Sequence, residues 1–144
     1  MRSIPAVEDR NRPFEMDVLT LFKTLREFRA WIDQSKRKRV RFMRGYKEKI
    51  EKGIAPKIGE FRDKYGKTQE GSSPLFDLIL DTFYALRGPV RLMETELRPS
   101  VGMGVFLERW MMASAVESYL KECCHEADRH LDELEKEIES GSGG

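Results

Sequence analysis

The residues best equipped for chemistry lie close together near the C-terminal end of the chain. The segment from Glu122 to His130 holds both histidines and both cysteines of the sequence, together with two glutamates and an aspartate. Glu122 and His125 are three residues apart, which is the spacing of each Glu-x-x-His motif in carboxylate-bridged di-metal bundles. Such a centre needs a second Glu-x-x-His, and the chain has no further histidine. The sequence therefore predicts no metal site and no cofactor.

The adjacent cysteines suit a structural role better than a reactive one. Neighbouring residues of a helix point about 100° apart, so Cys123 and Cys124 cannot easily chelate one ion together. Cys124 continues an apolar stripe, and we expect it to be a small core residue. The chain contains no Gly-x-Ser-x-Gly, no phosphate-binding loop and no dinucleotide fingerprint. We therefore expect no catalytic residues and a protein that is not an enzyme.

A second kind of chemistry is offered by the segment Lys36–Lys52, here called the basic block, which has nine basic residues against Glu48 and Glu51. Cations three or four residues apart on a helix can follow a line of phosphates, and nearby aromatic rings can stack on bases. The alternatives are a solvated helix face, a contact with an acidic protein surface, or binding of nucleic acid or anionic lipid. A pI of about 7.8 is low for a dedicated nucleic-acid domain. The candidate contact residues are Lys36, Arg37, Lys38, Arg39, Arg41, Arg44 and Lys47.

The opposite charge gathers in the segment Val116–Glu139, here called the acidic block, with nine acidic and three basic residues. The two blocks carry about +7 and −6, although the whole chain sums to +1. Such sorting indicates either two faces that meet each other or two surfaces offered to different partners.

Composition points to a single helical domain. The chain has 144 residues, of which 40% are hydrophobic and 35% charged, as is typical of helices with solvated faces. We expect an N-terminal extension over residues 1–13, one helical-bundle domain over 14–140 and a linker remnant over 141–144. No apolar run approaches the roughly 20 residues of a membrane span, and the N-terminus lacks the apolar region of a signal peptide.

The N-terminal half shows helical periodicity in its apolar residues. From Phe14 to Ile32 they step alternately by four and three residues, the pattern of a helix that faces a core. The pattern continues less cleanly through the basic block. We favour one long or kinked helix over about 15–52, ended by Gly53, over two helices joined near Gln34-Ser35.

Short elements are expected in the middle of the chain. Pro56 can open a short helix that Gly66 closes, and residues 66–73 form a loop. Ser73-Pro74 reads as an N-cap followed by proline in the first turn of the next helix.

That next helix, from Pro74, is apolar on most sides, so we place it in the middle of a bundle. Asp77 and Asp81 are interpreted as its solvent-facing stripe. We expect Gly88-Pro89 to stop this helix and a short helix to follow over about 89–98.

The last segment carries the longest pattern. Apolar residues keep a heptad frame from Phe106 to Ile138, which predicts a helix of 30 or more residues. Its acidic second half has a narrow apolar stripe, so we expect it to project past the core or to pair with another helix. The fold class predicted is an all-α bundle with long N- and C-terminal helices and shorter helices between them.

These features favour an adaptor or scaffold domain of a larger intracellular protein, with Lys36–Arg39 resembling a nuclear import signal. We expect an apolar groove near Trp110, Met111 and Met112 to receive a helix or peptide of another protein, or a second copy of this chain. Nucleic-acid or anionic-lipid binding by the basic block is the alternative. The acidic contact residues are Glu126, Glu133 and Glu137.

Overall fold

The structure is a computed structural model, and it describes the backbone of residues 3–35, 39–95 and 105–143. Side chains are described within 13–35, 44–92 and 118–140. Every element in these ranges is a helix, which confirms the all-α bundle. In chain order the elements are α1 (Ser3–Ser35), α2 (Arg39–Glu48), the π-helix η2 (Lys49–Ile54), α3 (Ala55–Tyr65), the 3-10 helix η3 (Gln69–Ser72), α4 (Pro74–Thr95) and α5 (Val105–Gly143).

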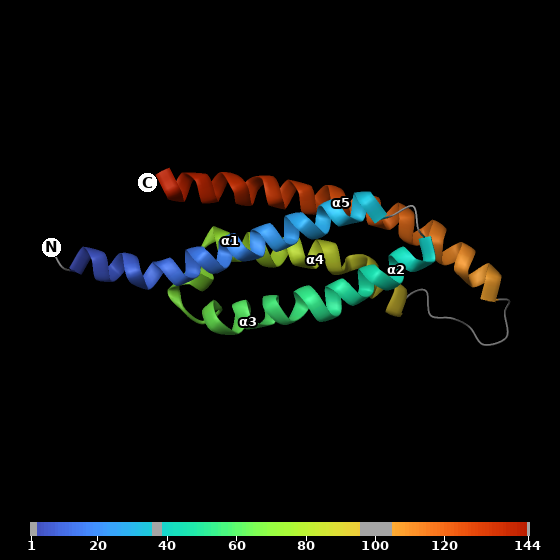
Figure 1. Cartoon of the computed structure of the whole chain (residues 1–144), viewed down its shortest axis with the longest axis horizontal. Helices are drawn as coiled ribbons and strands as arrows, with labels where there is room; N and C mark the ends of the chain where they lie inside the picture. The colour runs from blue at the N-terminus through green and yellow to red at the C-terminus, as the bar shows by residue number, and fades with distance from the viewer. Residues whose placement is uncertain (1–2, 36–38, 96–104, 144) are drawn as a thin grey trace.

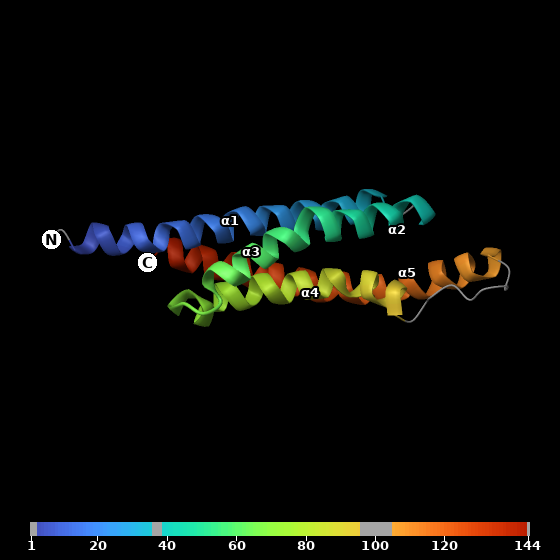
Figure 2. The ribbon, with the colours of Figure 1, turned by 90° about the horizontal axis from the view of Figure 1, so that it is seen from below.

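The helices form an up-down-up-down bundle (Figures 1 and 2). α1 and α4 run in one direction, and both the α2–η2–α3 rod and α5 run back in the other. Figure 2 shows α1 and α2 on one side and α4 and α5 on the other, with α3 slanting from the first side towards α4. The bundle is thus two antiparallel hairpins packed face to face, with α4 and α5 in the most extensive contact.

The prediction of one long helix over 15–52 is wrong. The ring of Phe14 lies 4.9 Å from that of Tyr65, and the ring of Phe28 lies 4.9 Å from that of Tyr46. The α2–α3 rod therefore runs back along α1, and residues 36–38 lie outside the described residues. The physical reason is burial, because a single rod would leave the apolar stripes on both of its halves in water. At its other end α1 begins at Ser3, earlier than expected, and passes through the exposed Pro13.

Gly53 does not end a helix either, because the rod continues through η2 into α3. The buried residues Tyr46, Ile50, Ile54 and Ile58 follow one another at intervals of four. Four residues of an α-helix turn through about 400°, so such a stripe drifts by about 40° at each step. A π-helix has more residues per turn and takes up this drift, which keeps the stripe on the core side. The closing of α3 at Gly66 and the proline in its first turn are as predicted.

α4 begins as the sequence predicts but ends later. The backbone N–H of Leu75 donates to the hydroxyl of Ser73 (3.2 Å), so Ser73 caps the helix. The predicted stop at Gly88-Pro89 is wrong, since α4 continues to Thr95. Pro89 is buried, and the buried hydroxyl of Tyr46 donates to the carbonyl of Leu86, in the turn that the proline disturbs. Tertiary packing around this turn thus holds a helix that local preference would break.

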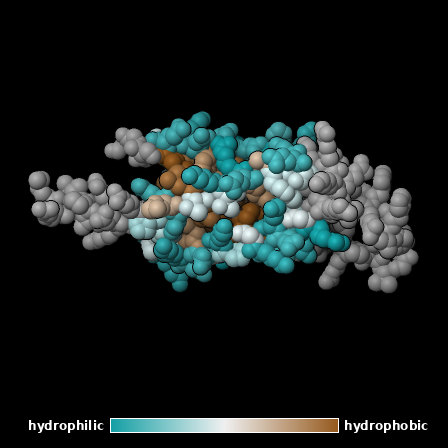
Figure 3. All heavy atoms as spheres, viewed as in Figure 1, coloured by the Kyte–Doolittle hydropathy of each residue, from teal (hydrophilic) through white to brown (hydrophobic). Residues whose placement is uncertain are grey.

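α5 fulfils the prediction of a long C-terminal helix, with 39 residues. Its acidic second half does not project past the core, because Leu131 and Leu134 are fully buried and Ile138 packs against the core. The core of the described residues draws on both hairpins, from Phe14 at the start of the α1 stripe to Leu134 of α5. On the face seen in Figure 3, apolar side chains show in furrows between ridges of hydrophilic ones.

Candidate functional site

The predicted apolar anchor lies on the first half of α5. Trp110, Met111 and Met112 belong to that helix, as expected, but their side chains lie outside the described residues. The apolar groove proposed around them therefore stays a prediction.

The basic block is only partly described. Arg44 and Lys47 are exposed on α2. Arg39 and Arg41 also belong to α2, but their side chains are outside the described part, as are residues 36–38 altogether. Arg44 and Lys47 are therefore the two predicted contact residues of this block that the structure places on the surface.

Among the described residues, the acidic block is bound by two cations of α1. The guanidinium of Arg29 donates to both carboxylate oxygens of Asp128, at 2.9 and 3.1 Å. Arg26 donates to Glu135 at 2.5 Å and lies 3.7 Å from Asp132. Burial lowers the pKa of Arg29, but hydrogen bonds to Asp128 and Asp33 together raise the pKa by more than burial lowers it. The guanidinium therefore stays charged. The contact between the hairpins is thus partly electrostatic.

The three acids predicted as contact residues form a stripe on the exposed side of α5. Glu126, Glu133 and Glu137 are all exposed, and separations of 7 and 11 residues place them within about 20° of one direction. Glu126 lines a groove of about 450 Å³ between α4 and α5, here called the acidic groove. Its lining residues are Asp81, Tyr84, Ala85, Tyr119, Glu122, Cys123, Glu126 and His130.

Two tyrosines give the acidic groove its apolar surface. Tyr84 of α4 is 40% exposed and Tyr119 of α5 is 39% exposed, so both side chains have surface free for contact. Gly88 lets Tyr119 lie close to α4, because a Cβ added there would be 3.1 Å from the Tyr119 hydroxyl and 2.9 Å from the sulfur of Cys123. The guanidinium of Arg87 lies 5.0 Å from the Tyr84 ring centre, so one cation already uses this ring.

Three carboxylates, those of Asp81, Glu122 and Glu126, surround the tyrosines. Glu126 also lies 3.6 Å from Arg129 and 3.8 Å from His130, which are loose contacts on an exposed side chain. Carboxylates beside exposed aromatic rings attract ammonium and guanidinium groups by charge and by cation–π contact. The arrangement is therefore suited to hold a cationic side chain.

The thiol of Cys123, which lines the acidic groove, is not activated for covalent chemistry. Burial raises the pKa of Cys123, so its sulfur stays protonated at neutral pH. The neighbouring thiol, followed by burial, likewise raises the pKa of Tyr119. Cys124 is buried in the core, as predicted. Within the described part of the chain, no three histidine, cysteine or acidic side chains gather closely enough to hold a metal ion.

Sequence reasoning missed both tyrosines, although a signal was present. Asp77 and Asp81 are exposed, which confirms them as the solvent-facing stripe of α4. Tyr84 lies seven residues after Asp77 and so belongs to the same stripe, and Tyr119 stands in the same relation to Glu126. A large aromatic residue on an acidic, solvent-facing stripe is the signal that would have identified the groove.

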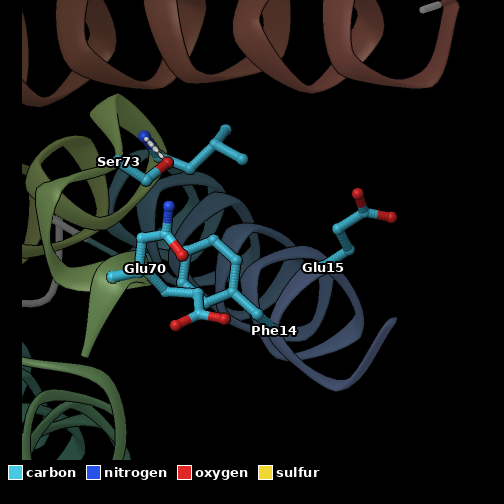
Figure 4. A pocket seen from close by; sticks show the side chains of 6 residues that line it. Phe14, Glu15, Glu70 and Ser73 are labelled. Carbon is cyan, nitrogen blue, oxygen red and sulfur yellow. Dashed lines mark hydrogen bonds between the residues drawn. The ribbon is translucent and has the colours of Figure 1, made fainter. Parts of the chain in front are cut away.

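A second hollow lies at the other end of the molecule, where α1 meets the η3 turn (Figure 4). Phe14 and Glu15 come from α1, and Glu70 and Ser73 from the turn and the start of α4. The Ser73 hydroxyl is already used to cap α4. The Thr68 hydroxyl and the backbone of Glu70 itself lower the pKa of the Glu70 carboxyl. This hollow offers little for a ligand beyond what its own residues already use.

Comparisons with family models, with curated proteins and with solved structures gave no match. Among the described helices, none has a stretch long and apolar enough to cross a membrane.

Proposed function

We propose that this chain is a non-enzymatic interaction module that binds a lysine- and arginine-rich segment of a protein in the acidic groove. The observation that carries the proposal is the joint placement of Tyr84 and Tyr119, each about two-fifths exposed, among three carboxylates. Adaptor or scaffold work of this kind requires no catalytic step. A nuclear setting belongs to the same proposal and rests on Lys36–Arg39, which resembles a nuclear import signal.

Physical chemistry favours a basic occupant over an apolar one. Tyrosines at protein interfaces bury their ring while the hydroxyl keeps a polar partner. The aliphatic stems of lysine and arginine can cover the rings while the charged heads reach the surrounding carboxylates. An apolar segment would instead remove water from the carboxylates of Asp81, Glu122 and Glu126 without supplying a cation, at a large cost in free energy.

The binding test uses a short fluorescein-labelled peptide of alternating lysine and alanine, followed by anisotropy. We expect saturable binding, which Tyr84→Ala combined with Tyr119→Ala weakens at least about tenfold, since each buried aromatic anchor contributes 1 kcal/mol or more. Glu60→Gln on α3, exposed and remote from the groove, is the matched control and should bind like the unmodified chain. Circular dichroism verifies that each variant is folded.

Two results would overturn the proposal. Equal binding of a glutamate–alanine peptide, or of the lysine peptide by the double tyrosine variant, would exclude the groove as the site. Tighter binding of an oligonucleotide or an anionic vesicle at about 0.05 M salt would instead favour phosphate recognition by the basic block.

A further inference from the structure

We infer, building on the proposed function, that the basic segment held in the acidic groove is α2 of a second copy of this chain. Arg44 and Lys47 would supply the cations, and Tyr84, Tyr119 and the surrounding carboxylates would receive them. The inference joins the two charged surfaces that the described residues place on opposite sides of the bundle.

The acidic groove cannot take α2 of its own molecule. Asp81 and Tyr84 are on the exposed side of α4, whereas Phe83 and Leu86 are buried on its inner side. Tyr46 of α2 donates to the carbonyl of Leu86, which fixes α2 against that inner side. Figure 2 agrees, with α2 and the outer surface of the α4–α5 hairpin on opposite sides of the bundle. Contact between α2 and the groove therefore requires two molecules.

α2 is a good candidate for the occupant because it presents its cations on a fixed scaffold. Tyr46 is fully buried, and its neighbours Arg44 and Lys47 are exposed. A helix anchored in this way loses little conformational freedom when it docks, which lowers the entropic cost of association. The opposing charges also suit each other, and a net charge of only +1 keeps the general repulsion between copies small.

The contact would join two different surfaces, the groove of one copy and α2 of the next. Such a heterologous contact leaves one free groove and one free α2 at the ends of every dimer. Association should therefore continue beyond dimers as concentration rises, unless a ring closes. It should also weaken with salt, because the pairing is between exposed charges.

The test is sedimentation velocity of the whole chain at about 0.05 M and about 0.5 M salt. We expect the average mass to grow with concentration at low salt and to return towards that of a monomer at high salt. Glu122→Lys with Glu126→Lys should weaken association at least tenfold, and so should Arg44→Glu with Lys47→Glu. An equimolar mixture of these two variants should associate again, since each supplies the surface that the other lacks. Lys57→Glu, exposed on α3, serves as the control and should associate like the unmodified chain.

The outcomes separate this inference from the proposed function. A chain that stays monomeric at low salt, yet binds the lysine–alanine peptide in its groove, overturns the inference and leaves a different protein as the partner. Association that both charge-reversed pairs leave unchanged overturns it as well. A chain that neither associates nor binds the peptide removes both proposals together.

Discussion

At the scale of single residues, one turn of α4 carries much of the packing between the helices. A Cβ added at Gly88 would meet Tyr119 and Cys123 of α5. Pro89 is buried beside it, and the carbonyl of Leu86 accepts a hydrogen bond from the Tyr46 hydroxyl of α2. The same turn therefore links the core to the floor of the acidic groove. Small changes here should affect stability out of proportion to their size, because neighbouring atoms leave no space for relaxation.

Gly88→Ala should destabilise the chain by about 1–3 kcal/mol, the usual cost of overpacking a core. The added Cβ would lie 2.9 Å from the Cys123 sulfur, so the helices must separate or the side chains must shift. Urea unfolding followed by circular dichroism measures the difference. Gly59→Ala on α3 is the matched control, with nothing within 4 Å of the added Cβ, and should stabilise by about 1 kcal/mol through helix propensity. A Gly88→Ala variant as stable as the Gly59→Ala variant would contradict the close contact.

Cys124 should make the stability of the fold fall at alkaline pH. Burial raises its pKa from 9.0 to about 11, so the unfolded chain releases this proton at lower pH than the folded chain. The contribution is fully present below about pH 9 and is lost between about pH 9 and 11, to a total of about 2–3 kcal/mol. Urea unfolding at a series of pH values should show Cys124→Ala losing less stability over this range than the unmodified chain. Parallel curves for the two proteins would contradict the assignment, because Tyr46, whose pKa is raised first of all by its own burial, is present in both.

At the scale of elements, some helix ends are set by local sequence signals, whereas others are decided by packing. Ser73, Pro74 and Gly66 act on their own neighbours, so the ends that they define could be read from the sequence. Gly53 and Pro89 are breakers only where nothing opposes them, and here the buried residues on either side continue the helix. The four-residue intervals between the apolar residues from Tyr46 to Ile58 were a sequence signal for the π-helix, because an α-helix cannot keep such a stripe on one side.

Ser73→Ala should destabilise the chain by about 1 kcal/mol, because it removes the cap from the first turn of α4. The Leu75 N–H, now 3.2 Å from the serine hydroxyl, would lose that acceptor. Ser72→Ala, exposed and one residue earlier, should stay within about 0.5 kcal/mol of the unmodified chain. Thermal unfolding of the pair compares them directly, and equal melting temperatures would show that the hydroxyl does not cap the helix.

At the scale of the whole molecule, the direction of the helices decides what the sorted charge does. The sequence gives the sizes of the two blocks but not the reversal between α1 and α2, which depends on contacts such as Phe28 with Tyr46. In the resulting bundle Arg26 and Arg29 of α1 pair with Glu135 and Asp128 of α5. The acidic groove could not be predicted either, because it is formed by Tyr84 of α4 and Tyr119 of α5, and the sequence does not show that these two helices pack together.

The ion pairs between the hairpins should differ sharply in strength. Arg29 is only 19% exposed and binds Asp128 through two hydrogen bonds, whereas Arg26 is 42% exposed beside Glu135. Asp128→Asn takes from the partly buried guanidinium one of its two carboxylate partners and should cost about 2–3 kcal/mol. Glu135→Gln, with the same chemistry at an exposed pair, should cost less than about 1 kcal/mol. Urea unfolding at low and high salt measures both. Because exposed ion pairs are screened, added salt should reduce the destabilisation by Glu135→Gln, while that by Asp128→Asn persists. Equal destabilisation by the two substitutions would mean that burial does not determine the strength of these ion pairs.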